Sequence, residues 1–296
     1  MAMGAHIRSL AGNDHAGTLY PAAVYVTRVL LCIIGRSTGA SRGVATNLLL
    51  DWWGVFSPES GYEVFNALDG QRVGLIKSLV DTVLDGREAL IRVATEDPSV
   101  ATAELLTCAE AGWVTEGMIF PGADDTTYSD DTIPGLSWPD KITQEWRNIP
   151  GPRSYSADLV ESAFVRFSNA KGGCVVQLQG DVVSALGASQ SKMLFPAALT
   201  GTAKLLEVIR SSPNALCVAA VSILLSWWGK WEAAEGYEVF LDSRGRRVGL
   251  LSAINATVYD QHEMLADVAV RVPESGAGDL LQCASLGWIR QSALHH

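Results

Sequence analysis

The sequence predicts an α+β fold in which one domain, ordered helix, helix, hairpin, helix, helix, occurs twice. Two observations lead to this prediction. Several motifs return along the chain at a constant distance, and within each copy apolar residues at helical spacing flank a short hairpin signal. Because 48% of the residues are hydrophobic, each copy can bury a core.

The repeated motifs are all separated by 175 positions. They are Trp-Trp-Gly, Gly-Tyr-Glu-Val-Phe and Gly-Trp, which begin at Trp52/Trp227, Gly61/Gly236 and Gly112/Gly287. Residues 19–114 match the second copy without a gap. Such a match indicates a tandem duplication, and two copies of one domain in a chain predict pseudo-twofold symmetry.

Each copy opens with two helices. Pro21 suits the first turn of a helix, and Leu30, Leu31 and Ile34 follow at helical spacing. A serine, Ser37 or Ser212, is expected to cap the second helix. That helix should end at the Trp-Trp pair, with the following glycine, Gly54 or Gly229, terminating it.

A hairpin and two further helices complete the copy. β-forming residues on both sides of Asp69-Gly70 or Arg244-Gly245 predict hairpins over Tyr62 to Leu75 and Tyr237 to Leu250. A single third helix is expected to carry its apolar face from Leu79 to Val93 and to end at Pro98 or Pro273. A short last helix then carries Leu105, Leu106 and Cys108.

The repeat defines four segments. They are an N-terminal arm at 1–18, a first repeat domain at 19–114, an acidic connector with lead-in elements at 115–193 and a second repeat domain at 194–296. Within the lead-in, the sequence predicts a helix ending near Ser168, a strand at Cys174 to Leu178 and a further helix.

Charge and cysteine usage limit the partners and the compartment. A net charge of -10 disfavours nucleic acid, whose binders are usually basic. Five scattered cysteines without a CxxC pair favour reduced thiols in the cytoplasm, an organelle interior or a virion. The apolar stretches are too short for a membrane helix, so we expect no membrane partner.

No residue pattern predicts catalysis, a cofactor or a metal. The histidines have no ligand spacing, and the pairs Asp124/Asp125 and Asp130/Asp131 lack the glycine and glutamate of an EF-hand loop. Asp85 and Glu88 should share a polar helix side, where an exposed acidic face is commoner than acid/base chemistry. We therefore expect that the protein is not an enzyme.

The residues singled out as structural or interface anchors are aromatic or cationic. Tryptophans beside glycines usually fill cores or interfaces, and an arginine after a hairpin turn pairs more often with a carboxylate than with an anion. These anchors are Trp52, Trp53, Trp113, Trp227, Trp228, Trp288, Arg72 and Arg247.

Two helices followed by a hairpin resemble a winged-helix DNA-binding unit. The helix before each hairpin, Val44 to Trp53 or Ala215 to Trp228, has no Lys or Arg, whereas a recognition helix uses them to reach phosphates and bases. A tandem winged-helix nucleic-acid-binding or regulatory module is therefore the second hypothesis. An enzyme with an active site between the halves is the third.

The first hypothesis is a structural protein that assembles with itself. A duplicated chain presents similar surfaces twice, which suits a homo-oligomer or an extended lattice, coat or shell. A viral coat protein or the shell protein of an intracellular compartment would fit this description.

Overall fold

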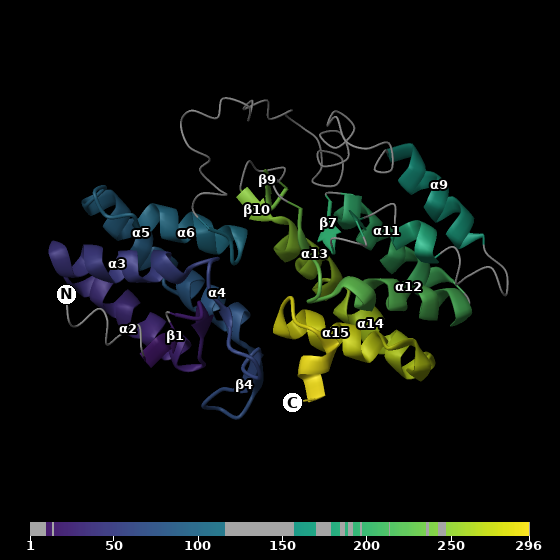
Figure 1. The fold of residues 1–296 in the computed structure, drawn as a ribbon, viewed down its shortest axis with the longest axis horizontal. Helices are drawn as coiled ribbons and strands as arrows, with labels where there is room; N and C mark the ends of the chain where they lie inside the picture. Colours follow the sequence, from purple (N-terminus) through teal and green to yellow (C-terminus); the bar gives the residue numbers. More distant parts are fainter. Residues whose placement is uncertain are drawn as a thin grey trace. The chain divides into compact units, whose positions relative to one another are not determined.

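The computed structural model divides the chain into two compact units (Figure 1). Unit one comprises residues 1–130 with 247–249 and 296, and unit two comprises 131–246 with 250–295. The structure describes residues 10–13, 15–115, 157–169, 179–183, 187–188, 192–195, 197–212, 214–234, 237–241 and 247–295.

Helices make up most of unit one. They are α2 (Ala22–Arg36), α3 (Ala40–Trp52), α4 (Leu75–Asp85), α5 (Arg87–Glu96) and α6 (Thr102–Ala111). Helix α2 packs against α3, α4 and α5, and α6 packs against α3, α4 and α5. The core between them consists of fully buried aliphatic side chains such as Leu30, Leu49, Leu79 and Leu105.

Two small sheets complete this set. Strands β1 (Gly12–Asn13), β2 (Thr18–Leu19) and β3 (Ser57–Pro58) form one sheet, and β4 (Val64–Asn66) pairs with β5 (Arg72–Gly74) in an antiparallel hairpin. Strand β2 pairs antiparallel with β1 and parallel with β3, with Thr18 opposite Ser57. The hairpin lies where the sequence predicts it, whereas the three-stranded sheet was not expected.

After a shift of 175 positions, the bounds of the strands and α-helices named next follow those of unit one to within one residue, whereas η3 and η4 have no earlier counterpart among the described elements. The strands are β6 (Gly187–Ala188), β7 (Met193–Leu194), β8 (Glu232–Ala233), β9 (Val239–Leu241) and β10 (Arg247–Gly249). The helices are α11 (Ala197–Ser211), α12 (Asn214–Trp227), α13 (Leu250–Tyr259), α14 (His262–Arg271), η3 (Pro273–Ser275), α15 (Ala277–Leu286) and η4 (Gln291–His295). Strand β7 again pairs antiparallel with β6 and parallel with β8.

The expected single third helix is wrong, because it is broken into α4 and α5 at Gly86 and into α13 and α14 near Gln261. A continuous helix over 75–96 would be about 33 Å long, at 1.5 Å per residue. The break lets α4 and α5 each pack against α2 and bury Leu79 and Leu90 in one core. It also places Asp85 and Glu88 in different helices, so they do not share one helix side.

The expected capping role of Ser37 and Ser212 is also wrong. The backbone N–H of Ser37 donates to Ile33 O at 2.8 Å and closes α2, and Ser212 closes α11 in the same way through Val208 O. Helix α3 starts after Gly39 without a side-chain cap. The serines therefore end the first helix of each set instead of starting the second.

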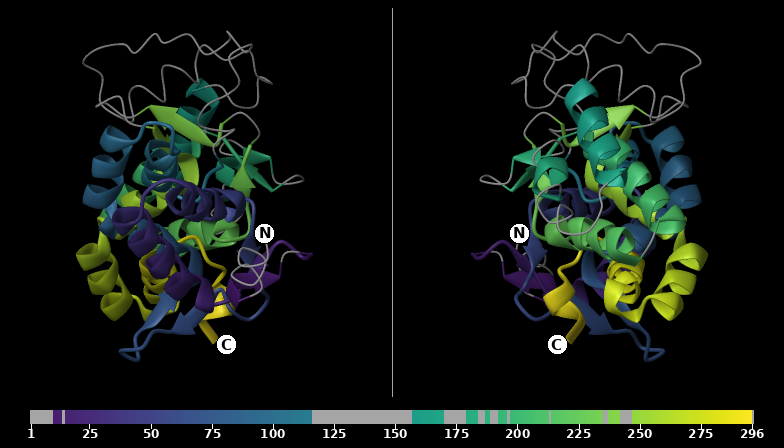
Figure 2. Two further views of the ribbon diagram at one scale, coloured as in Figure 1. Left: turned by 90° about the vertical axis from the view of Figure 1, so that its left-hand side faces the viewer. Right: turned by 90° about the vertical axis from the view of Figure 1, so that its right-hand side faces the viewer.

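A lead-in precedes α11 in unit two. We use this term for α9 (Ala157–Ser168) together with the helical residues 179–183. Helix α9 packs against α11 (Figure 1 and Figure 2). The Phe164 and Phe167 side chains of α9 are buried. The predicted helix ending near Ser168 is confirmed, and the strand expected at 174–178 lies outside the described residues.

Among the helices of the described residues, none is both long and apolar enough to cross a membrane.

Candidate functional site: paired tryptophans and an arginine network

Two tryptophans in unit one link the segment that follows α6 to the turn that follows α3. The rings of Trp53 and Trp113 lie 4.6 Å apart between centroids, within the range of favourable aromatic pairs. The indole N–H of Trp53 donates to Gly112 O at 3.1 Å, and that of Trp113 donates to Phe56 O at 2.9 Å. We call this arrangement the tryptophan clamp.

The same clamp occurs in unit two. Trp228 and Trp288 have their ring centroids 4.6 Å apart. Trp228 Nε1 donates to Gly287 O at 3.3 Å, and Trp288 Nε1 donates to Trp231 O at 3.0 Å. Each hydrogen bond therefore has its counterpart 175 positions earlier, down to the accepting carbonyl.

A glycine lets the backbone pass close beneath each clamp. Gly54 has φ +70° and Gly229 φ +62°, the left-handed region that glycine adopts without strain. A Cβ atom on Gly54 would lie 2.5 Å from the backbone nitrogen of Thr115, and one on Gly229 would overlap the backbone of Ile289 and Arg290. The Trp-Trp-Gly motif thus supplies both the ring and the space for the returning chain.

The first tryptophan of each pair has a different environment. Trp52 and Trp227 are buried, as the sequence predicts for the Trp-Trp pairs, and so are Trp53 and Trp228. The indole N–H groups of Trp52 and Trp227 have no hydrogen-bond acceptor among the described residues. An unpaired buried donor costs about 1–3 kcal/mol, so these two rings contribute through packing alone.

The two arginines singled out in the sequence lie in the hairpins. Arg72 begins β5, opposite Asn66, and its side chain is exposed. Arg247 begins β10, and its side chain lies outside what the structure describes. Glu63, a carboxylate near Arg72 in sequence, accepts the backbone N–H of Gly61 at 2.9 Å. The ion-pair role of Arg72 and Arg247 stays a prediction.

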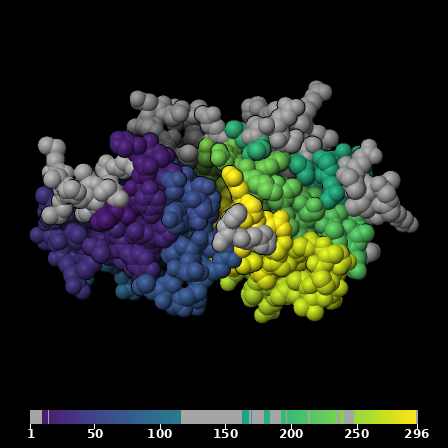
Figure 3. Space-filling view, turned by 60° about the horizontal axis from the view of Figure 1, so that its bottom comes forward, coloured from purple at the N-terminus to yellow at the C-terminus, as the bar shows by residue number. Residues whose placement is uncertain are grey.

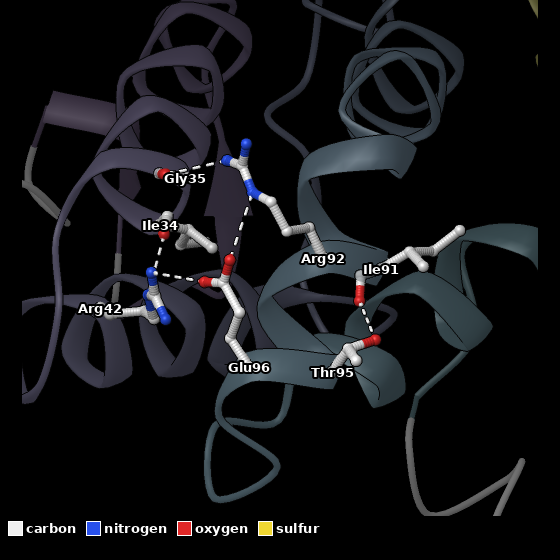
Figure 4. Close-up of polar contacts among 7 residues, drawn as sticks. All are labelled: Ile34, Gly35, Arg42, Ile91, Arg92, Thr95 and Glu96. Atoms are coloured by element: carbon white, nitrogen blue, oxygen red, sulfur yellow. Dashed lines mark hydrogen bonds and ion pairs between the residues drawn. The ribbon is translucent and has the colours of Figure 1, made fainter.

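A second polar cluster, which the sequence did not indicate, joins the end of α2 to α3 and α5 (Figure 4). Arg42 Nε donates to Ile34 O at 3.1 Å, and Arg92 Nη2 donates to Gly35 O at 3.1 Å. Glu96 lies between the arginines, 3.7 Å from Arg42 and 3.9 Å from Arg92. Two cations thus meet the carbonyls at the negative end of the α2 dipole.

Unit two replaces this cluster with other chemistry. The counterparts of Arg42, Arg92 and Glu96 are Cys217, Asp267 and Arg271. Arg271 Nε pairs with Asp267 at 2.8 Å, so the charges of the helix pair are reversed. The polar residues of this cluster are therefore not shared between the units.

The buried thiols are held in their neutral form. Burial raises the pKa of Cys283 to about 12, with Asp279 adding to the rise and Lys230 opposing it. Burial also raises the pKa of Cys217, against a lowering by Arg271. Since the thiolate is the reactive form, neither thiol is suited to nucleophilic chemistry at neutral pH.

In the described ranges, no group of three or more His, Cys, Asp or Glu side chains is placed to hold a metal ion. The acidic pairs at 124–125 and 130–131 lie outside those ranges. His262 Nδ1 lies 3.1 Å from Tyr259 O, and its ring stacks on that of Tyr259. This histidine is accounted for by local contacts.

No protein-family model matches the chain, and no match was found among curated proteins or solved structures.

Proposed function

We propose that the chain is a tandem duplication with pseudo-twofold symmetry, and that it is a structural protein which assembles with copies of itself into a lattice, coat or shell. The observation that carries the proposal is the clamp built twice, with ring distances of 4.6 Å in both units. A scaffold present twice in one chain offers related surfaces in two places, and related surfaces allow one kind of contact to propagate.

The surfaces available for such contacts include exposed apolar side chains in both units. Val29, Val44 and Leu68 are exposed in unit one, and Tyr259 in unit two. They lie on helices or on the tip of the β4–β5 hairpin. Assembly contacts usually centre on apolar and aromatic side chains that lose their water, so these positions suit that use.

The proposed location is a reducing compartment, namely the cytoplasm, an organelle interior or a virion. Cys108, Cys217 and Cys283 are free and buried, and Cys32 is free and exposed. Free thiols persist in reducing surroundings.

A size measurement on the purified chain tests the proposal. Sedimentation velocity and negative-stain electron microscopy should show particles, sheets or tubes far above the 31.6 kDa monomer mass. Assembly should proceed without nucleic acid, because the chain itself carries a charge of -10 and needs no polyanion to neutralise it. A chain that stays monomeric at high concentration contradicts the proposal.

A tandem nucleic-acid-binding or regulatory module is the alternative. It is favoured by the antiparallel β4–β5 hairpin, which follows the helix pair α2 and α3 as a wing would. Retention on DNA or RNA that falls steeply as salt rises would support this alternative.

A further inference from the structure

Among the residues that the structure describes, one surface of unit one lacks a cover that its counterpart in unit two possesses. In unit two the lead-in touches α11 and α12 at two defined positions. The Lys204 ammonium lies 6.0 Å from the centroid of the Phe164 ring of α9, and Gln179 Nε2 donates to Ala219 O at 3.0 Å. Ala219 itself is only 5% exposed.

The corresponding positions of unit one are Val29 on α2 and Val44 on α3. Their side chains are 60% and 55% exposed, so no described residue covers them. Figure 3 shows purple atoms, which belong to described residues before about residue 50, at the surface of unit one. Apolar side chains thus stand in water at the two positions where unit two places its lead-in.

Two arginines near these valines also have no charged counterpart in unit two. Arg28 and Arg36 are exposed on α2 and form no ion pair among the described residues, whereas their counterparts are Ala203 and Ser211. Asp51 is the one acidic residue of α2 or α3. We call the region of Arg28, Val29, Cys32, Arg36 and Val44 the α2–α3 surface.

We propose that the α2–α3 surface is a docking site for a second copy of this chain. This inference rests on the self-assembly proposed above. The cationic rim is complementary to a partner of net charge -10, and the two valines supply an apolar centre. The cationic rim would repel the same rim of a second copy, so the contact is head-to-tail, the kind that generates rings or open arrays.

The first test compares glutamate substitutions at exposed valines. Val29→Glu with Val44→Glu should raise the concentration for half-assembly at least tenfold, because a charge is placed in the contact. Val270→Glu is the matched control, since Val270 is 81% exposed on α14 of unit two. It should leave that concentration within twofold. Far-UV circular dichroism of all variants checks that the helices remain formed.

The second test uses Cys32 as a reporter, because it lies one turn from Val29 on α2 and is exposed. Alkylation by a maleimide, located by peptide mass spectrometry, should be at least tenfold slower in the assembled chain than in dilute monomer. The double glutamate variant should keep the fast rate at both concentrations.

The outcomes separate this inference from the proposed function. If the wild type assembles and the double variant assembles equally well, the α2–α3 surface is not the contact, although self-assembly stands. Cys32 that is protected even in monomer would mean that a segment of the same chain covers the surface, which overturns the docking proposal. If the wild type never assembles, both proposals fail.

Discussion

At the residue scale, the second tryptophan of each Trp-Trp motif does more than fill space. Trp53 packs on Trp113 and also ties the end of α6 to the turn after α3 through the Gly112 carbonyl. Replacing Trp53 by Ala should lower the free energy of unfolding by about 3–5 kcal/mol, since a large buried ring is lost. Urea unfolding followed by tryptophan fluorescence and circular dichroism measures this. A loss below about 1 kcal/mol would indicate a surface role for the ring.

Neighbouring tryptophans allow the hydrogen bond to be separated from the packing. Trp53→Phe removes a donor and leaves the Gly112 carbonyl unpaired, whereas Trp52→Phe removes an N–H that has no acceptor among the described residues. We expect Trp53→Phe to cost about 1–3 kcal/mol more than Trp52→Phe in urea unfolding. Equal costs for the two variants would show that the bond to Gly112 adds no net stability.

The raised pKa of Cys283 predicts how the free energy of unfolding changes in alkaline solution. Its folded pKa is about 12, raised above the ordinary value of 9.0, so the unfolded chain loses this proton first. The contribution of Cys283 is therefore fully present below pH 9 and is lost as pH rises towards 12. Stability should fall by up to about 1.4 kcal/mol per pH unit in this window.

Unfolding by urea at pH 8, 9 and 10, in wild type and Cys283→Ala, isolates this thiol from the other groups that titrate there. The difference in stability between the two proteins should shrink as the pH rises. A difference that stays constant would contradict the shifted pKa.

At the element scale, the turn after α3 depends on glycine for two reasons, its positive φ and the close approach of the returning backbone. Gly54→Ala should destabilise unit one, because the new Cβ strains the turn and meets Thr115 at 2.5 Å. Gly70→Ala is the matched control, since Gly70 has φ +81° with no atom within 4 Å of an added Cβ.

Both variants pay about 1–2 kcal/mol for the left-handed backbone, and Gly54→Ala should lose more in thermal or urea unfolding because only it also clashes. Equal losses would show that the chain can move away from the turn without cost.

At the scale of the whole molecule, charge governs how assembly responds to salt. Copies with a net charge of -10 repel one another, and added salt screens that repulsion. Exposed ion pairs between the rim arginines of the α2–α3 surface and a second copy would contribute only about 0–1 kcal/mol each. Their weakening by salt therefore matters less than the screening of the net repulsion. The screening length shortens as NaCl rises from about 50 to about 300 mM. Light scattering over this range should show assembly that is unchanged or enhanced.

Dissociation over the same salt range would instead mean that attraction between charged groups drives assembly. Adding nuclease should change nothing, because nucleic acid is expected to be dispensable.

Much of the local structure could be predicted from the sequence. The constant spacing of the Trp-Trp-Gly motif, the hairpin around Asp69-Gly70 and the helix ending near Ser168 are all local signals, because each depends on neighbouring residues or on direct repetition. Burial of the Trp-Trp pairs also followed, since large apolar rings beside a glycine are rarely left in water.

The tertiary structure decided what depends on residues distant in the chain. Pairing of Thr18 with Ser57, and of the Trp53 and Trp113 rings, joins segments that share no local signal. The break at Gly86 arises because two helical faces must reach one core, and no proline marks it. Sequence by itself thus determined which motifs recur at a constant spacing and where most of the helices and the hairpin form. Packing determined where helices break and which surface of α2 and α3 stays uncovered by the described residues, because burial depends on what the rest of the chain places alongside.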